Sequence, residues 1–393
     1  MKNDELKDIL LQKLLMHRRL TRQEFLNLYP CRPASMLSAI NELKSCGYIC
    51  EPDRVGAKTG RRSPVLTLNE ELGAFAGIEL QAHKLVGIVL DNNENILAQE
   101  IMDFPAGIPA PAIPARLTEL VHTLQSRLPH RDLPWRGVGF ADPGLVDLDR
   151  QKSLRAHNVP GWVDVPINNW LQELFGIKEV FIAPETMART FAEYYFHRPA
   201  PPASMCVVEL DTGIGASFIK NGLLLSGSNS RGMELGHLVI KPGGALCKCG
   251  NQGCLEAIAG EYGIKQKISE MIAGHVTTEL TVNGSLDEFV DAVKKHDRAA
   301  ALIAGEACKA VAQAVTVLVT LLNPEAIVFT GRLAKLDNIL LETVRSTLNI
   351  NCFFGAVEKL KLEISQQDEF AAARGAALMT RERFLRSDIK LWL

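Results

Sequence analysis

The chain has 393 residues, of which 47% are hydrophobic and 22% charged, so it is long enough for roughly two to three domains and is not intrinsically disordered. Its first residues are charged, so we expect no secretory signal peptide, and its uninterrupted apolar stretches are too short to cross a bilayer. The nine cysteines are an odd number and several are isolated, which argues against a disulfide framework and predicts a cytoplasmic protein without a membrane partner.

Charge is distributed unevenly along the chain. Residues 1–66 carry 12 Lys and Arg against 7 Asp and Glu, a net charge of +5, whereas the whole chain has a net charge of −2. A small basic module on a larger acidic body suggests a nucleic-acid-binding head that is joined to a sensor or an enzyme.

The basic segment has the pattern of a winged helix-turn-helix. Apolar residues at helical spacing predict a first helix around Ile9–Met16, and Thr21-Arg-Gln-Glu24 has the form of a capping box for the second. A third helix is expected from Pro33 to Gly47, followed by strands at residues 48–50 and 65–68 that can pair as a hairpin. A winged domain that docks a protein instead of DNA is the alternative.

The second helix of such a motif enters the major groove, and a flexible basic wing contacts phosphates or the minor groove. The residues expected at DNA are Arg32, Ser35, Met36 and Ser38 at the start of that helix, and Lys58, Arg61 and Arg62 on the wing.

The most specific chemical pattern is a histidine followed by three closely spaced cysteines, namely His237, Cys247, Cys249 and Cys254. Three thiolates and one imidazole form a tetrahedral set that is typical of structural zinc and leaves no open position for catalysis. The sequence therefore predicts one structural Zn²⁺ per chain, with free buried thiols as the alternative.

After residue 70, strands and helices alternate, as in an α/β body of two lobes. Strands are expected at residues 76–80, 85–90, 137–140, 179–182, 206–210, 215–220 and 326–330. Helices are expected at residues 115–128, 167–175 and 299–322 and near residues 370–384.

The chain resembles the ROK family (repressors, open reading frames, sugar kinases) over essentially its whole length. The likeness is greatest to the long family members, the repressors that respond to xylose, N-acetylglucosamine or glucose. It rests on the histidine and cysteine cluster, on Asn158-Val-Pro-Gly-Trp162, on Asp142-Pro-Gly144 and on the wing segment Gly60-Arg-Arg-Ser-Pro64.

The resemblance implies an α/β fold in which an N-terminal winged helix-turn-helix precedes a two-lobed, actin-like body of the sugar kinase/Hsp70 ATPase type. The expected boundaries are residues 1–70 for the DNA-binding head and 71–182 for the first lobe, to which residues 376–393 return. Residues 183–375 are expected to form the second lobe, with the zinc loop and the sugar site.

The resemblance also implies a sugar site that contains Glu234 and His237, Glu256 after the last cysteine, and Glu185 and Asn158. Carboxylates suit a sugar because each accepts two hydrogen bonds from hydroxyl groups. Zinc would fix His237 and the loop that carries Glu256, without taking part in the chemistry.

Two parts of the kinase machinery are altered in this chain. Family kinases have Asn-Asp where this chain has Pro184-Glu185, so Glu185 stands at the position of the general base on a side chain one methylene longer. The first phosphate loop, Asp-x-Gly-Gly-Thr, is replaced by Glu79–His83, whereas the second, Asp211–Gly215, is intact. Arg332 would block the adenosine side of the nucleotide site. No catalytic residue is therefore expected.

The leading hypothesis is a sugar-responsive DNA-binding regulator, preferably a repressor, of a carbohydrate-utilisation operon. Its catalytically silent sugar-kinase fold would sense a sugar or sugar derivative. The expected partners are operator DNA, the sugar and further copies of the chain in a homodimer or tetramer. An active ATP-dependent sugar kinase is the alternative, and a scaffold for a phosphotransferase-system protein is a third hypothesis.

Overall fold

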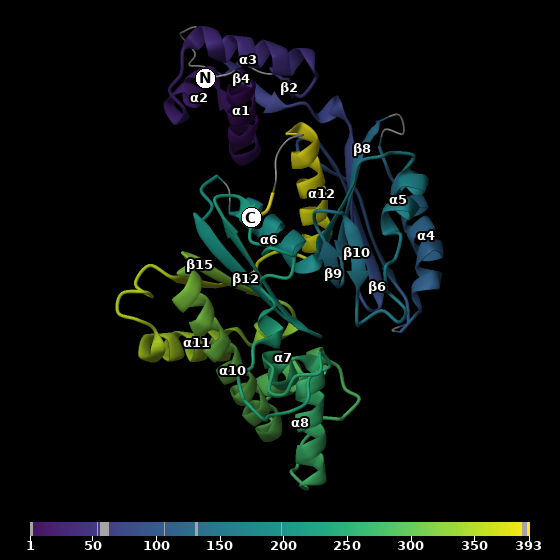
Figure 1. Ribbon diagram of the computed structural model, residues 1–393, viewed down its shortest axis with the longest axis vertical. Coiled ribbons are helices and arrows are strands. Elements are labelled where there is room, and N and C mark those ends of the chain that lie inside the picture. The colour runs from purple at the N-terminus through teal and green to yellow at the C-terminus, as the bar shows by residue number, and fades with distance from the viewer. Residues whose placement is uncertain are drawn as a thin grey trace. The chain divides into compact units, whose positions relative to one another are not determined.

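The computed structural model describes residues 3–52, 54–55, 63–105, 107–129, 133–197, 199–386 and 391–393. Its internal contacts divide the chain into two compact units (Figure 1). Unit 1 comprises Met1–Pro201 and Gln367–Leu391, and unit 2 comprises Pro202–Gln366 and Trp392–Leu393. The N-terminal head and the first α/β lobe therefore form one unit, and the predicted zinc ligands lie in the other.

The head is a winged helix-turn-helix, as predicted. Its elements are α1 (Asn3–His17), β1 (Arg19–Thr21), α2 (Arg22–Leu28), α3 (Pro33–Ser45), β2 (Ile49–Cys50), β3 (Arg54–Val55) and β4 (Ser63–Leu68). Strand β4 pairs antiparallel with β1, β2 and β3. The predicted capping box is present, because the amide of Glu24 donates to Thr21 Oγ1 at 3.2 Å and the amide of Thr21 donates to Glu24 Oε2 at 2.7 Å.

The first lobe is a five-stranded sheet in the order β11–β8–β5–β6–β7. Its strands are β5 (Ala74–Leu80), β6 (Lys84–Asp91), β7 (Ile96–Asp103), β8 (Trp135–Asp142) and β11 (Val180–Pro184), with a small hairpin of β9 (Leu145–Asp147) and β10 (Lys152–Arg155). The helices are α4 (Ile113–Ser126), α5 (Ile167–Phe175), α6 (Glu185–Phe196) and α12 (Ala371–Leu385). Because β5, β8 and β11 are parallel, Glu79, Asp142 and Glu185 all lie at the carboxyl edge of the sheet.

Helix α12 packs tightly against the sheet and against α6 (Figure 1). A Cβ atom on Gly77 would lie 1.9 Å from the carbonyl oxygen of Ala373, and one on Gly375 would lie 1.8 Å from the carbonyl oxygen of Ala188. Only glycine permits such close approach of two backbones. The sheet, α6 and α12 therefore have no space for a methyl group between them at these points.

This packing places α6 in unit 1, whereas we expected the second lobe to begin at residue 183. The chain returns to unit 1 at Gln367, earlier than the expected residue 376, and its last two residues belong to unit 2. The head joins unit 1 as well, because the end of α12 bonds to it.

Unit 2 contains a second five-stranded sheet, in the order β14–β13–β12–β15–β16. Its strands are β12 (Ser204–Leu210), β13 (Ile214–Lys220), β14 (Leu223–Leu224), β15 (Ala326–Thr330) and β16 (Lys361–Ile364). Its helices are α7 (Leu255–Ala259), α8 (Glu261–Ala273), α9 (Leu286–Lys294), α10 (Arg298–Leu322) and α11 (Asp337–Asn351). Both sheets combine an antiparallel meander with parallel strands, the arrangement of the actin-like fold.

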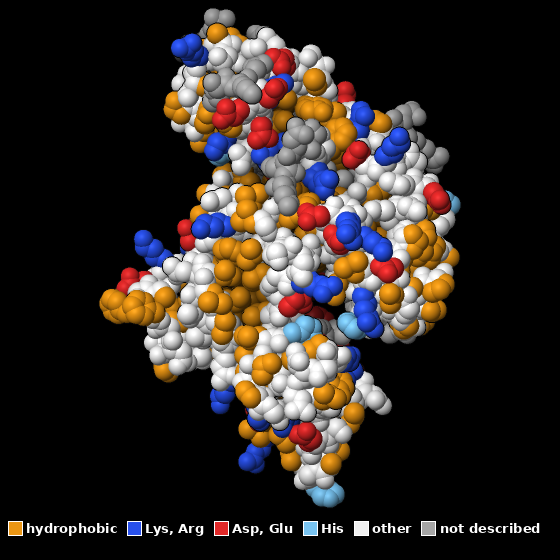
Figure 2. All heavy atoms as spheres, viewed as in Figure 1, with side chains coloured by type: hydrophobic (Ala, Val, Ile, Leu, Met, Phe, Trp, Pro, Cys, Tyr) orange, Lys and Arg blue, Asp and Glu red, His pale blue; other side chains and the backbone are white. Residues whose placement is uncertain are grey.

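Helix α10 is long and apolar enough to cross a membrane by length and composition alone, but 61% of its most apolar window is buried inside the structure. A helix whose apolar residues are mostly buried in this way is typical of a protein core. Exposed apolar side chains gather instead at the end of α11 (Figure 2), where Ile350, Phe353 and Phe354 are 81%, 85% and 92% exposed.

Candidate functional site

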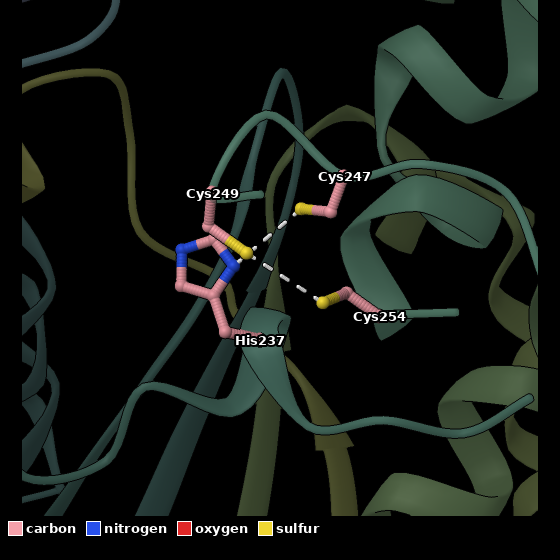
Figure 3. Close-up of side chains that lie close together, drawn as sticks. All are labelled: His237, Cys247, Cys249 and Cys254. Carbon is pink, nitrogen blue, oxygen red and sulfur yellow. Dashed lines mark hydrogen bonds between the residues drawn. The ribbon is translucent and has the colours of Figure 1, made fainter. Parts of the chain in front are cut away.

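The four predicted metal ligands come together in unit 2 (Figure 3). Their ligand atoms all lie within 4.8 Å of one another. Cys247 Sγ is 3.7 Å from His237 Nδ1, and Cys249 Sγ is 3.7 Å from Cys254 Sγ. A tetrahedral zinc with Zn–S bonds of about 2.3 Å separates two sulfurs by roughly 3.8 Å, so this cluster has the dimensions of a zinc site.

Two short segments hold these ligands in place. His237 ends a 3₁₀ turn, η3 (Leu235–His237), and Cys254 is the residue before α7. The amide of Leu255 donates to the carbonyl oxygen of Leu238 at 2.9 Å, which ties the two segments together directly beside both ligands.

The cysteine loop needs its glycines. Gly253 has φ +78°, and a Cβ atom there would lie 1.7 Å from the carbonyl oxygen of Lys241. Gly250 has φ +94° between Cys249 and the turn that leads to Cys254. Both conformations are ones that L side chains rarely adopt. The loop can therefore fold tightly enough for three cysteines to face one point.

The residues present fit a closed metal site. Cys254 is fully buried and Cys247 is 4% exposed, so a hard, hydrated cation is unsuited to the cluster, whereas a thiolate-binding metal is suited to it. All four ligands come from the protein, which leaves no coordination position for a substrate.

The residues predicted to bind a sugar are divided between the two units. Glu185 and Asn158 belong to unit 1, and Glu234, His237 and Glu256 belong to unit 2. Glu234 and Asn158 are exposed, and Asn158 lies in a turn. In unit 2, both glutamates are close in sequence to a metal ligand. Glu234 directly precedes η3, which ends at His237, and Glu256 lies in α7, which follows Cys254.

Glu256 also has a structural contact that the sequence did not suggest. Its Oε2 accepts a hydrogen bond of 3.0 Å from the amide of Ile214, within the segment expected to be the second phosphate loop. A Cβ atom on Gly213 would lie only 2.8 Å from the same oxygen. The amide of Ile214 therefore already donates its hydrogen bond to a carboxylate and is not available to a phosphate.

Arg332 closes the same loop from the other side. Its Nε donates to Asp211 Oδ1 at 2.9 Å, its backbone amide donates to Asp211 Oδ2 at 2.8 Å, and its Nη2 donates to Thr212 Oγ1 at 2.9 Å. Burial would raise the pKa of Asp211, but its contacts with Arg332 hold that pKa below its usual value. Arg332 therefore ties the loop together through a half-buried charge pair with Asp211.

In unit 1, one guanidinium joins two carboxylates at the carboxyl edge of the sheet. Arg189 on α6 contacts Glu185 Oε1 at 2.8 Å and Glu79 Oε1 at 3.2 Å, and Gln81 donates to the same Glu79 oxygen at 2.6 Å. Glu79 is fully buried, and burial followed by the nearby Glu185 raises its pKa well above the usual value. Arg189 was not among the predicted site residues, although its position four residues after Glu185 in a helix was a signal for this pair.

The two remaining family segments have structural contacts. Asp142 is 1% exposed, and Trp162 is fully buried and donates through Nε1 to Ser153 Oγ at 2.8 Å. The Asn158–Trp162 segment therefore anchors itself in the core of the first lobe through its tryptophan.

The head presents only part of the predicted DNA contact set. Arg32, Ser35 and Ser38 are exposed at the start of α3. The prediction for Met36 was wrong, because this side chain is 3% exposed and packs in the core of the head on the inner face of α3. The wing residues Lys58, Arg61 and Arg62 lie outside the residues that the structure describes.

Comparison with known proteins assigns the family. The ROK family profile matches residues 75–383. The chain belongs to the ROK family. The xylose repressor of Caldicellulosiruptor bescii is 24% identical over 376 residues, which cover 94% of each chain. The N-acetylglucosamine repressor of Escherichia coli O157:H7 is 25% identical over 358 residues, covering 89% of this chain and 86% of the repressor.

A family enzyme aligns with less of the chain. The glucokinase of Thermotoga maritima is 30% identical over 252 residues, which are 63% of this chain and 79% of the glucokinase. Among solved structures, a ROK family transcriptional regulator described as a homologue of the E. coli MLC protein superposes with a TM-score of 0.79 at 22% identity, covering 98% of this chain and 97% of that chain. The latter comparison shows the shared fold.

Proposed function

We propose that this ROK protein is a sugar-responsive, DNA-binding transcriptional regulator that acts as a repressor of a carbohydrate-utilisation operon in the cytoplasm. The observation that carries the proposal is the winged helix-turn-helix of residues 3–68 joined to the ROK body. The two repressors described above align with 89% or more of this chain, so their similarity extends well beyond the part shared with the glucokinase.

The metal in this proposal is one structural Zn²⁺ per chain, held by His237, Cys247, Cys249 and Cys254. Support comes from the separation of their ligand atoms and from the thiol-rich donor set, in which Cys247 and Cys254 are buried. Bound zinc would supply rigidity to the two segments that carry Glu234 and Glu256, because both begin or end at a ligand.

The ligand in this proposal is a sugar or a sugar derivative. Glu185, Glu234, Glu256, His237 and Asn158 are the residues proposed to contact it. Glu256 Oε2 accepts from the amide of Ile214 and Glu185 Oε1 accepts from Arg189, so a sugar hydroxyl that donates to either carboxylate shares it with a group of the protein.

We further propose that the chain does not phosphorylate this sugar. General-base catalysis needs a free carboxylate near the hydroxyl, but Arg189 pairs with Glu185 at 2.8 Å. Phosphate binding needs free loop amides, but Glu256 bonds the amide of Ile214 and Arg332 bonds Asp211. Each contact opposes a different requirement of phosphoryl transfer.

The proposed partners besides the sugar are operator DNA and further copies of the chain, in a homodimer or tetramer. A phosphotransferase-system protein is proposed as a further partner. A dimer suits the proposal because two heads on one operator read half-sites related by two-fold symmetry.

The proposal is tested in two steps with the full chain. A thermal-shift screen of pentoses, hexoses and amino sugars should find a ligand, since a ligand at about 100 times its dissociation constant adds about 2.7 kcal/mol of stability. Binding to DNA from upstream of its own operon should weaken linearly with salt on a logarithmic scale, at a slope of about −0.9 per phosphate contacted. Absence of DNA binding at any salt concentration would refute the proposal.

A further inference from the structure

A series of polar contacts runs through unit 1 from Glu185 to the DNA-binding head, with the backbone of α6 as the connection between Arg189 and Tyr195. It begins on α6, where Arg189 Nη2 donates to Glu185 Oε1 at 2.8 Å. Further along the same helix, the hydroxyl of Tyr195 donates to Glu382 Oε2 on α12. Helix α6 therefore carries a ligand-site carboxylate at its first residue and a contact with α12 in its last turn.

The series continues from α12 to the first helix of the head. Arg386, the residue after α12, donates through Nη1 to Glu382 Oε1 at 2.6 Å. The same guanidinium holds the carboxylate of Asp8 on α1 with two bonds, one of which runs from Nη2 to Oδ2 at 2.9 Å. A two-point contact between a guanidinium and a carboxylate fixes orientation as well as distance.

Three of the side chains in this series are shielded from water, whereas Asp8 is partly exposed. Tyr195 is 3% exposed, Glu382 is 6% exposed, and the side chains of Arg386 and Asp8 are 9% and 45% exposed. Burial and the neighbouring Glu382 raise the pKa of Tyr195 well above its usual value, so its phenol stays a hydrogen-bond donor. Among Tyr195, Glu382 and Arg386 a lost hydrogen bond is therefore not replaced by water, and these three side chains constrain one another.

A second set of contacts holds the head to the same end of α12. Arg381 is 1% exposed, and it donates to the carbonyl oxygen of Asn92 at 3.1 Å. The side-chain amide of Asn92, itself fully buried, donates to the carbonyl oxygens of Tyr48 and Asn69 at 3.3 and 3.1 Å. The end of α12 therefore positions both α1 and the strand region of the head.

Helices α6 and α12, which carry these contacts, are in direct backbone contact. The backbone of Gly375 on α12 approaches the carbonyl oxygen of Ala188 on α6 so closely that a Cβ atom would lie at 1.8 Å. Ala188 is the residue before Arg189. A displacement of the α6 backbone at Ala188 and Arg189 therefore reaches α12 directly, because close-packed helices move together instead of compressing.

We infer that Tyr195, Glu382 and Arg386 are positioning residues that couple occupancy of the ligand site at Glu185 to the orientation of the DNA-binding head. This inference rests on the proposed function. A sugar hydroxyl that bonds Glu185 competes with Arg189 for the carboxylate and shifts α6. The shift then alters the Tyr195–Glu382 contact and, through Arg386, the hold on Asp8.

The test compares DNA affinity with and without sugar for the wild type, Tyr195→Phe and Asp8→Asn. The DNA is a duplex that the full-length wild type selects from a random pool, and the sugars are D-xylose, D-glucose and N-acetyl-D-glucosamine. Tyr195→Phe removes one hydroxyl without a change of shape, and Asp8→Asn is a second variant at the other end of the series. Tyr194→Phe is the matched control, since it makes the same change one residue away.

The wild type and Tyr194→Phe should show a sugar-dependent change in DNA affinity in the range of about 5- to 150-fold that is typical of allosteric coupling. In Tyr195→Phe and Asp8→Asn, the change should fall below about 3-fold, while sugar affinity and DNA affinity without sugar stay near wild-type values. Undiminished coupling in both variants, or loss of sugar or DNA binding itself, would overturn the inference. No sugar effect in the wild type would refute the proposed function.

Discussion

Arg189 Nη2 lies 2.8 Å from Glu185 Oε1, so the carboxylate expected at the position of the family kinases' general base is held in an ion pair within its own helix. The same nitrogen lies 3.2 Å from the fully buried Glu79. One cation therefore contacts two acidic groups at the edge of the sheet, although burial and the nearby Glu185 still raise the pKa of Glu79.

Replacement of Arg189 should consequently destabilise unit 1. We expect Arg189→Ala to lower the free energy of unfolding by about 2 kcal/mol, because it removes a hydrogen-bond partner of the fully buried Glu79 and the ion-pair partner of Glu185. Urea unfolding measures this loss. Arg116→Ala is the control, since Arg116 pairs with Glu119 on the surface of α4 and its loss should cost less than about 1 kcal/mol. Similar losses in both variants would contradict the assigned role of Arg189.

Asp142 should make stability depend on pH. Burial raises its pKa from 3.8 to about 7, although the amide of Gly144 bonds its carboxylate. Between these values the folded protein holds a proton that the unfolded chain releases. The stabilisation is therefore complete below the ordinary pKa and is lost as pH rises through about 7.

Asp142→Asn cannot ionise, so its free energy of unfolding should vary less between about pH 5 and about pH 8 than that of the wild type. The advantage of the variant should grow with pH, to a few kcal/mol at most, because one unit of pKa corresponds to about 1.4 kcal/mol. Denaturant titrations at several pH values give the comparison. Parallel pH curves for the two proteins would show that Asp142 does not titrate in this range.

The metal site gives a third prediction. Protein purified without added metal should contain close to one zinc per chain by elemental analysis. Cys249→Ser should lose the metal and the local fold of the loop, since a structural zinc can contribute on the order of 10 kcal/mol to folding. Cys352→Ser, a free cysteine outside the cluster, should keep its zinc. A folded wild type that contains no metal would refute the assignment.

Met36 and Ser35 should separate structural from DNA-contact roles within one helix. Met36 is 3% exposed, so Met36→Ala should destabilise the head by about 2–5 kcal/mol without changing which DNA sequences are preferred. Ser35→Ala should change sequence preference without a comparable loss of stability, because Ser35 is exposed. Thermal unfolding and DNA selection distinguish the two effects. A changed sequence preference in folded Met36→Ala would restore Met36 as a base contact.

The sequence predicted those elements whose pattern of residues is contained within the element itself. The Thr21 capping box and the periodicity of α3, α5 and α10 are contained within short segments, and the structure confirms each of them. Strand β1 was missed because its three residues gain their conformation from pairing with residues 65–67, far along the chain. No local pattern specifies such a strand.

The same distinction applies to the site. The metal ligands lie within one segment of residues 237–254, so their spacing alone brought them together correctly. The contact between Arg189 and Glu79 joins residues 110 positions apart, and its geometry depends on the packing of α6 against the sheet. Met36 was assigned to DNA because it lies near the start of α3. Its place on the buried face of that helix, with Ile40 and Leu43, was not taken into account.

The measurement that tests the proposed function most directly is a titration of the wild-type chain with selected operator DNA, with and without each sugar, in the presence of ATP and with ADP formation recorded in the same samples. We predict that one sugar weakens DNA binding at least about 5-fold while ADP formation stays at the level of a sample without protein. A sugar-dependent turnover of about 1 s⁻¹ or more would instead identify a working kinase. DNA affinity that no sugar alters would contradict the sensor role.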